Sequence, residues 1–225
     1  MKTFIQHFVH IHAQKVLIDG VLRYEETATA LDFPAFIRNV YKHFEMQYPK
    51  FYKMDDLSKL AFVGAELLNL KKSDVYKSED KGIVLMNRSS SLYTDALHQA
   101  SIADKNNYFP SPAVFVYTLP NIAIGELCIR HQISGENYFF VQEHFNPAML
   151  TNYVSLLFRQ KHIQQCICGW VELNADNYEL FLYSVEQNSE NAVKIVDKSP
   201  IFASLNLEGN HILNDTDNIK KLYKL

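Results

Sequence analysis

The sequence predicts an α/β fold in which helices cover the faces of a sheet. Strand-like and helix-like segments alternate along the chain, and this order favours layers of helix packed on strand. The run Gly82–Met86 is wholly apolar, as expected of a strand buried on both faces. Met54–Leu70 repeats apolar or small residues at the spacing of one helix face. With 225 residues, 48% of them hydrophobic, the chain can bury a core, and we expect a single domain over 1–225.

Turn and cap residues define the first elements. Thr3–His12 has the composition of a strand, and Asp19-Gly20 between two apolar runs predicts a two-residue hairpin turn. Asp32 followed by Pro34 predicts the start of a helix that runs to about Phe44. No repeat, low-complexity tract or Gly/Ser linker divides the chain, which agrees with one domain.

Strands and helices continue to alternate after a charged loop at 71–81. In chain order we expect a strand Gly82–Met86, a short helix opened by Ser89-Ser90-Ser91 and reaching Ile102, a helix Pro120–Arg130, a buried strand Tyr138–Val141, a helix Pro147–Gln160 capped by Asn146, a strand Gln165–Leu173, and an antiparallel pair of Tyr178–Val185 with Ala192–Asp197. The part after Asn174 is predicted to be a short β-rich tail.

Charge and composition exclude several classes of protein. The net charge of −3, with no basic stripe, argues against nucleic acid as a partner. The N-terminus lacks a small-residue cleavage site, and no apolar run approaches the ~18 residues that a membrane-spanning helix needs. Cys128, Cys166 and Cys168 are an odd number of cysteines in apolar surroundings, which favours buried, reduced thiols. We therefore expect a cytoplasmic protein without a membrane partner.

The stretch from Ser111 to His144 resembles β-ketoacyl synthases. Four short features follow one another without gaps, in the order that this family shows before its nucleophilic cysteine: Ser111-Pro112, Pro120-Asn121, Gly125-Glu126 and Gly135-x-Asn137. Upstream, Met54–Ala61 is similar to the family's Met-Asp-Arg helix and Gly82–Met86 to a core strand; downstream, Cys166–Glu172 is similar to the strand that ends in Ala-Gly-Gly-Ala-Glu. The resemblance covers residues 50–175 and implies a thiolase-like half-fold, with α/β/α layers around a mixed five-stranded sheet.

Two departures from the family pattern bear on activity. Where the nucleophilic cysteine should stand, three residues before Pro147, the chain has His144, preceded by Gln142 and Glu143. A histidine cannot form the acyl thioester that condensation requires. The family's two catalytic histidines lie in a C-terminal half that nothing after Asn174 resembles. The resemblance thus implies a degenerate nucleophile position, no catalytic residue, no cofactor and no metal.

Ketosynthase-like chains without a nucleophile are known as chain length factors, and each pairs with a catalytic ketosynthase. This sequence resembles the half-length chain length factors of aryl-polyene and flexirubin-type type II polyketide systems, which are related to fatty acid biosynthesis. The resemblance implies a heterodimer with a catalytic ketosynthase, an acyl carrier protein reached through the complex, and Ser134–Val141 as a central strand near the two-fold axis. For the isolated chain, both a monomer and a homodimer stay open.

The same resemblance implies which residues line the acyl tunnel and limit chain length. Carried over without gaps, they are Ser89, Leu92, Tyr93, Ala96, Ala113, Val114 and Phe115. Small side chains at Ser89, Ala96 and Ala113 would leave the far end of the tunnel open, as a long rigid polyene requires.

Two other functions are compatible with these residues. In the first, Glu143 orients His144 as the base of an acyl-carrier-dependent decarboxylase or acyltransferase. In the second, the chain is a homodimeric relic that binds acyl chains or a partner. For His144 itself, filling the space left by the cysteine is favoured over a catalytic role.

Other polar groups have a simpler interpretation. His10 and His12 share a strand face, and we expect no acidic or cysteine ligand nearby, which favours a strand-borne histidine pair over a metal site. Ser89-Ser90-Ser91 lacks a Gly-rich loop or a Lys-Ser/Thr pair, so a helix cap and loop is favoured over a phosphate-binding turn.

Overall fold

The computed structural model describes residues 2–27, 31–68, 76–106, 108–175, 177–187, 207–208 and 211–224. The strands are β1 (Phe4–His12), β2 (Lys15–Ile18), β3 (Val21–Glu25), β4 (Lys81–Asn87), β5 (Asn137–Val141), β6 (Gln165–Asn174), β7 (Asn177–Glu186), β8 (Leu207–Glu208) and β9 (His211–Leu213). The α-helices are α1 (Phe33–His43), α2 (Asp56–Leu67), α3 (Leu92–Ile102), α4 (Pro112–Val116), α5 (Asn121–His131), α6 (Pro147–Arg159) and α8 (Thr216–Tyr223), with short 3₁₀ helices η1 (Pro49–Lys53) and η2 (Ser78–Asp80).

One mixed sheet joins the strands. Its order is β3-β2-β1-β7-β6-β4-β5, with β4 parallel to both β5 and β6, and β7 antiparallel to both β6 and β1. The expected count of five strands was wrong, because this path alone has seven. The hairpin β2–β3 continues the sheet beyond β1, and β9, itself paired with β8, adds to it beside Phe4 and Ile5.

Local turn and cap chemistry formed as predicted at the N-terminal elements. Asp19 and Gly20 both have positive φ, 51° and 76°, as a tight two-residue hairpin turn requires. Asp32 caps α1 by accepting a hydrogen bond from the backbone N–H of Ala35 at 2.8 Å, and Pro34 lies in the first turn.

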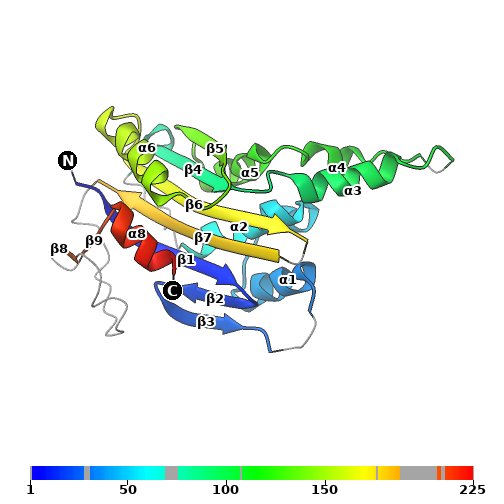
Figure 1. Ribbon diagram of the computed structural model, residues 1–225, viewed down its shortest axis with the longest axis horizontal. Coiled ribbons are helices and arrows are strands. Elements are labelled where there is room, and N and C mark those ends of the chain that lie inside the picture. Colours follow the sequence, from blue (N-terminus) through cyan, green and yellow to red (C-terminus); the bar gives the residue numbers. More distant parts are fainter. Residues whose placement is uncertain are drawn as a thin grey trace.

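Helices cover both faces of the sheet (Figure 1). One face is buried against α1, α2 and α5, and the other against α6 and α8. The predicted apolar strand lies between these two layers, and every residue of Gly82–Met86 is buried. The layered α/β prediction is therefore confirmed.

Strand β5 differs from the prediction of a buried strand. It forms the end of the sheet order, and in the described part of the chain only β4 pairs with it. Tyr138 and Val141 keep 38% and 52% of their surface exposed. Phe139 and Phe140 are partly buried against the two cores, so this apolar strand lies at the edge of the sheet and is only half covered.

The C-terminal part also departs from expectation. Tyr178–Val185 lies in β7, which pairs with β6 and β1; the proposed partner strand 192–197 lies outside the described residues. The tail is not only β-rich, because it ends in α8, capped by Asp215 through the N–H of Asn218 at 2.8 Å. Ile219 and Leu222 of this helix are buried in the core layer shared with α6.

Residues 88–106 and 108–120 form an arm that projects from the body of the molecule (Figure 1). Its helices α3 and α4 lie side by side, and the ring of His98 lies 5.3 Å from that of Phe115. The helix expected to open at Ser89 begins three residues later, at Leu92. Helix α4 was not predicted, although Ser111 caps it by accepting from the N–H of Val114.

Candidate functional site

The candidate site lies where the parallel strands β4 and β5 end. Ligand sites in α/β sheets gather at the carboxyl ends of strands, because the loops there converge. Here β4 leads into the turn 88–91, and β5 leads into the loop 142–146. The backbone N–H of Gln142 donates to the carbonyl of Asn87 at 2.8 Å and ties the two segments together. The structure thus brings Ser89 and His144 to the carboxyl ends of two neighbouring parallel strands.

His144 faces solvent. Its side chain is 79% exposed, and Nε2 lies 3.7 Å from Oε1 of Glu143, which is itself 86% exposed. The next residue, Phe145, turns inward, with its ring 4.7 Å from that of Tyr223 and 5.8 Å from that of Phe181. His144 therefore does not fill a buried space left by a cysteine, and its surroundings do not shield it from water.

The helix that follows this loop keeps a well-formed N-terminus. Asn146 caps α6 by accepting from the N–H of Met149 at 3.0 Å, and Pro147 is the first helical residue, as predicted. A helix start of this kind stabilises negative charge, such as a thiolate. The loop has no thiol, however: Cys166 and Cys168 are buried in β6, and burial raises the pKa of the Cys168 thiol.

The proposed tunnel residues lie on one arm. Ser89, Tyr93 and Val114 are partly buried, whereas Leu92, Ala96, Ala113 and Phe115 are exposed. Leu92 and Phe115 expose 58% and 61% of their surface, so these large apolar side chains of the arm face solvent rather than the core. In the isolated chain these residues do not enclose a tunnel.

Exposed apolar side chains gather on the arm, α5, β5 and α6. We define the apolar surface as Leu92, Leu97, Tyr108, Phe109, Phe115, Val116, Leu119, Ile129, Tyr138, Val141 and Leu156. These elements follow one side of the molecule (Figure 1). Concentrations of this kind mark interaction sites. Sequence periodicity did not identify Ile129 or Leu156, because it does not tell which helix face lacks a neighbour.

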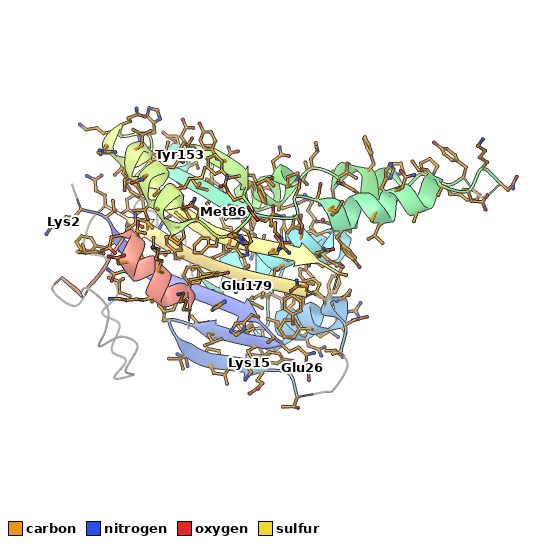
Figure 2. All side chains as sticks on the ribbon, viewed as in Figure 1. Lys2, Lys15, Glu26, Met86, Tyr153 and Glu179 are labelled. Atoms are coloured by element: carbon orange, nitrogen blue, oxygen red, sulfur yellow. The ribbon has the colours of Figure 1, made fainter. Side chains whose placement is uncertain are left out.

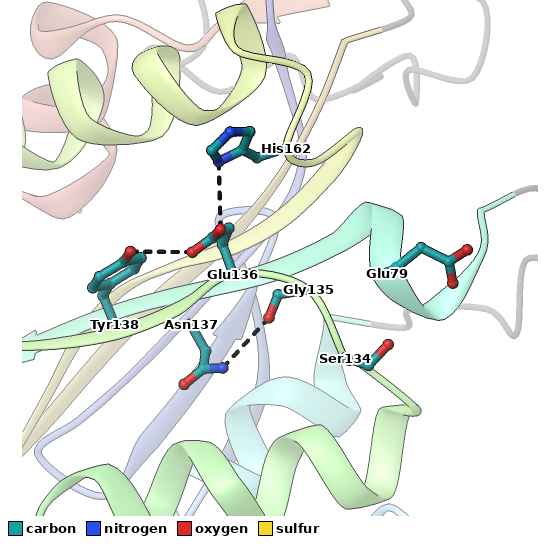
Figure 3. Close-up of a pocket in the computed structure, with 7 residues that line it drawn as sticks. All are labelled: Glu79, Ser134, Gly135, Glu136, Asn137, Tyr138 and His162. Atoms are coloured by element: carbon teal, nitrogen blue, oxygen red, sulfur yellow. Dashed lines mark hydrogen bonds and ion pairs between the residues drawn. The ribbon is translucent and has the colours of Figure 1, made fainter.

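A shallow polar pocket lies at the other end of β5 (Figure 3). Its volume is ≈ 460 Å³, and it is lined by Glu79, Ser134, Gly135, Glu136, Asn137, Tyr138 and His162. Nδ1 of His162 lies 3.4 Å from Glu136, which also accepts from the hydroxyl of Tyr138 at 3.1 Å. A Cβ at Gly135 would collide with the carbonyl oxygens of Glu79 and Lys81, so only glycine fits there. The pocket flanks the open edge rather than the loop that carries His144.

The histidines of β1 have a carboxylate neighbour that the sequence did not reveal. Nε2 of His10 lies 3.2 Å from Oε1 of Glu179, and the hydroxyl of Tyr223 donates to Glu179 at 2.8 Å. The expectation that no acidic group lies nearby was wrong, because Glu179 comes from the paired strand β7. Within the described ranges, no group of three or more His, Cys, Asp and Glu side chains is placed to hold a metal ion.

The fold is ketosynthase-like: an α/β protein with a mixed sheet and helices on both faces. No family model and no curated protein matches the sequence. Among the helices that the structure describes, none is long and apolar enough to cross a membrane.

Solved structures carry the likeness. The ishigamide ketosynthase/chain length factor has a TM-score of 0.58 at 16% identity, over 89% of this chain and 64% of that one. The ketosynthase ApeO in complex with its chain length factor ApeC, from Xenorhabdus doucetiae, has a TM-score of 0.51 at 11% identity, over 84% and 80%. The complex AntDE:AntF, a type II polyketide acyl-carrier protein with its ketosynthase, has a TM-score of 0.58 at 11% identity, over 83% and 62%. At these identities the likeness establishes the fold, and the chain spans less than two thirds of the first and third structures.

Proposed function

We propose that this chain is a chain length factor: a non-catalytic, ketosynthase-like subunit that pairs with a catalytic ketosynthase in type II polyketide, aryl-polyene or fatty-acid-like biosynthesis. The observation that carries the proposal is the open edge of β5, flanked by the apolar surface, in a ketosynthase-like fold whose nucleophile position holds an exposed histidine. The open edge and the apolar surface supply a docking surface. The histidine at the nucleophile position rules out the acyl thioester that condensation requires.

The hydrogen bonds of β5 indicate which backbone groups a partner strand can use. The N–H of Ile83 donates to the carbonyl of Glu136, and the N–H of Gln142 donates to that of Asn87. Because backbone groups alternate in direction along a strand, the even-numbered residues of β5 face β4. Asn137, Phe139 and Val141 therefore offer their N–H and C=O groups to the open edge, which supports docking by sheet extension.

The layers beside this edge also favour a partner of the same architecture. On α6, the ring of Tyr153 lies 4.9 Å from that of Tyr138 on β5 and 5.2 Å from that of Phe140, and Leu156 of the same helix is exposed (Figure 2). On the other side of the sheet, α5 exposes Ile129 by 64%. A second ketosynthase-like subunit would continue both helix layers as well as the sheet and bury an interface on the order of 2,000 Å².

A catalytic ketosynthase is the partner that this arrangement fits. The chain supplies no nucleophile, and its arm would extend over the partner and bring Ser89, with Leu92, Tyr93, Ala96, Ala113, Val114 and Phe115, to the far end of the partner's acyl tunnel. An acyl carrier protein would reach the complex through the catalytic subunit. The same edge would support a homodimer of the isolated chain.

The test places an aromatic ring at the proposed gate. Ser89→Phe, in a complex with a co-expressed catalytic ketosynthase, is expected to shorten the main product while the early condensations keep their rate. The ring blocks by sterics, since packed interiors yield little. Gln99→Phe, on an exposed position of α3, is the matched control and should leave the product unchanged. Unchanged product length with an intact complex would show that Ser89 is not the gate.

An enzymatic role for His144 predicts a different result. The isolated chain is expected to show no turnover of malonyl-carrier substrates, since His144 lacks a shielded pocket. Turnover that His144→Ala abolishes would overturn the non-catalytic proposal in favour of a decarboxylase or acyltransferase.

A further inference from the structure

A buried carboxylate accepts hydrogen bonds from the backbone of the turn that carries Ser89. Glu172, near the end of β6, is only 6% exposed. Its Oε2 accepts from the backbone N–H groups of Arg88 at 2.7 Å and Ser89 at 3.1 Å. A carboxylate of β6 thus fixes two successive amides at the end of the neighbouring strand β4.

A second buried side chain completes the arrangement. Asn87, fully buried, donates through Nδ2 to the carbonyl of Ser90 at 2.8 Å, and its Oδ1 accepts from the N–H of Ser90 at 3.0 Å. Ser90 itself has a left-handed φ of 51°. Three consecutive backbone N–H groups, those of Arg88, Ser89 and Ser90, therefore donate to buried side chains. Such a run of N–H groups is a nest of the kind that binds anions, and here Glu172 and Asn87 occupy it.

Stability alone does not account for a carboxylate at this position. Burying a charge costs free energy unless hydrogen bonds replace its hydration. Oε1 of Glu172 is buried without a hydrogen-bond partner among the described residues, and Glu179, another carboxylate, stands directly opposite on β7. Like charges at opposed positions of a sheet are destabilising. Glu172 instead fixes the backbone conformation of the surface turn that carries Arg88 and Ser89, a segment that would otherwise be mobile.

We infer that Glu172 is a positioning residue for chain-length selection: by holding the Arg88–Ser89 amides, it fixes where Ser89 stops the growing acyl chain. The inference rests on the proposed function. A gate separates products that differ by one condensation only if its own position varies by less than that step. Glu172 touches no acyl chain and acts through the turn.

The first test needs only this chain. Amide hydrogen exchange of Arg88 and Ser89 is expected to be at least about tenfold faster in Glu172→Ala, since each amide loses its acceptor. Glu172→Gln keeps a carbonyl acceptor and should restore slow exchange. Val185→Ala, a buried position at the other end of β7, is the matched control: it lowers stability without touching the turn. Unchanged exchange in Glu172→Ala, or equal acceleration in Val185→Ala, overturns the inference.

The second test uses the assembled complex and its product distribution. Glu172→Ala should yield neighbouring chain lengths beside the main product, whereas Glu172→Gln and Val185→Ala should keep one main length. If Ser89→Phe shortens the product but Glu172→Ala keeps a single length, the inference is overturned and the proposed function stands. If neither variant changes the product length of an intact complex while exchange at Arg88 and Ser89 accelerates, Ser89 is not the gate and the inference is overturned, although Glu172 holds the turn.

Discussion

Replacing Val141 by proline tests the docking edge while sparing the rest of the sheet. Val141 is an odd-numbered residue of β5, so its N–H faces the open edge and not β4. Its side chain is 52% exposed, so the substitution removes little packing. Proline is tolerated on edge strands where the missing N–H would have faced solvent. The isolated chain should therefore change in stability by no more than about 1 kcal/mol.

In the complex, the same substitution should cost much more. One backbone hydrogen bond contributes ~0.5–1.5 kcal/mol, and a partner carbonyl left buried and unpaired costs ~1–3 kcal/mol. Together they come to about 1.5–4.5 kcal/mol, which is roughly 10-fold to 2,000-fold in the dissociation constant. Isothermal titration calorimetry with the pathway ketosynthase measures this directly. Val141→Thr keeps both the N–H and the branched shape, and should bind nearly as the wild type does.

Two results would refute this reasoning. Unchanged affinity of Val141→Pro would show that β5 is not the docking edge. A loss of stability in the isolated chain as large as the loss of affinity would show that the N–H of Val141 already has a partner within the chain.

Three further properties follow from single side chains. Burial lowers the pKa of His131 from 6.5 to about 4, so the unfolded chain binds a proton before the folded chain does as pH falls. The free energy of unfolding should therefore drop by about 2 kcal/mol between pH 7 and pH 5. Urea unfolding of His131→Gln should lack this component. A thiol reagent should reach Cys128 in the folded chain but Cys166 and Cys168 only after denaturation, and rapid native labelling of either would contradict their burial. Asp55→Ala removes the cap of α2 and should cost ~1–2 kcal/mol by thermal unfolding, with Asp55→Asn closer to the wild type.

Local chemistry could be read from the sequence. The hairpin at Asp19-Gly20, the caps Asp32 and Asn146, and the buried strand Gly82–Met86 each depend on residues adjacent in the chain. What could not be read depends on partners far away. The apolar residues of β5 fit a covered strand and an open edge equally well, and the place of β7 between β6 and β1 follows from long-range pairing.

The candidate site shows the same division. The resemblance selected Ser89 and His144. Only the structure shows that both lie at the carboxyl ends of β4 and β5, where the backbone N–H of Gln142 donates to the carbonyl of Asn87. Glu172 stood in the matched strand without an assigned role. Its contact with Arg88 requires the parallel register of β4 on β6, which no single-sequence pattern encodes.

The open edge of β5 makes the solubility of this chain depend on how much of it is produced. Among the residues that the structure describes, nothing pairs with the outer backbone groups of β5 beside Tyr138 and Val141, and such groups can pair with an extended segment of another chain. Under the proposed function, copies made in excess of the partner would keep these backbone groups exposed until they were captured, self-associated or degraded. Overproduction of the chain on its own should then favour inclusion bodies, and co-production of the partner should relieve them.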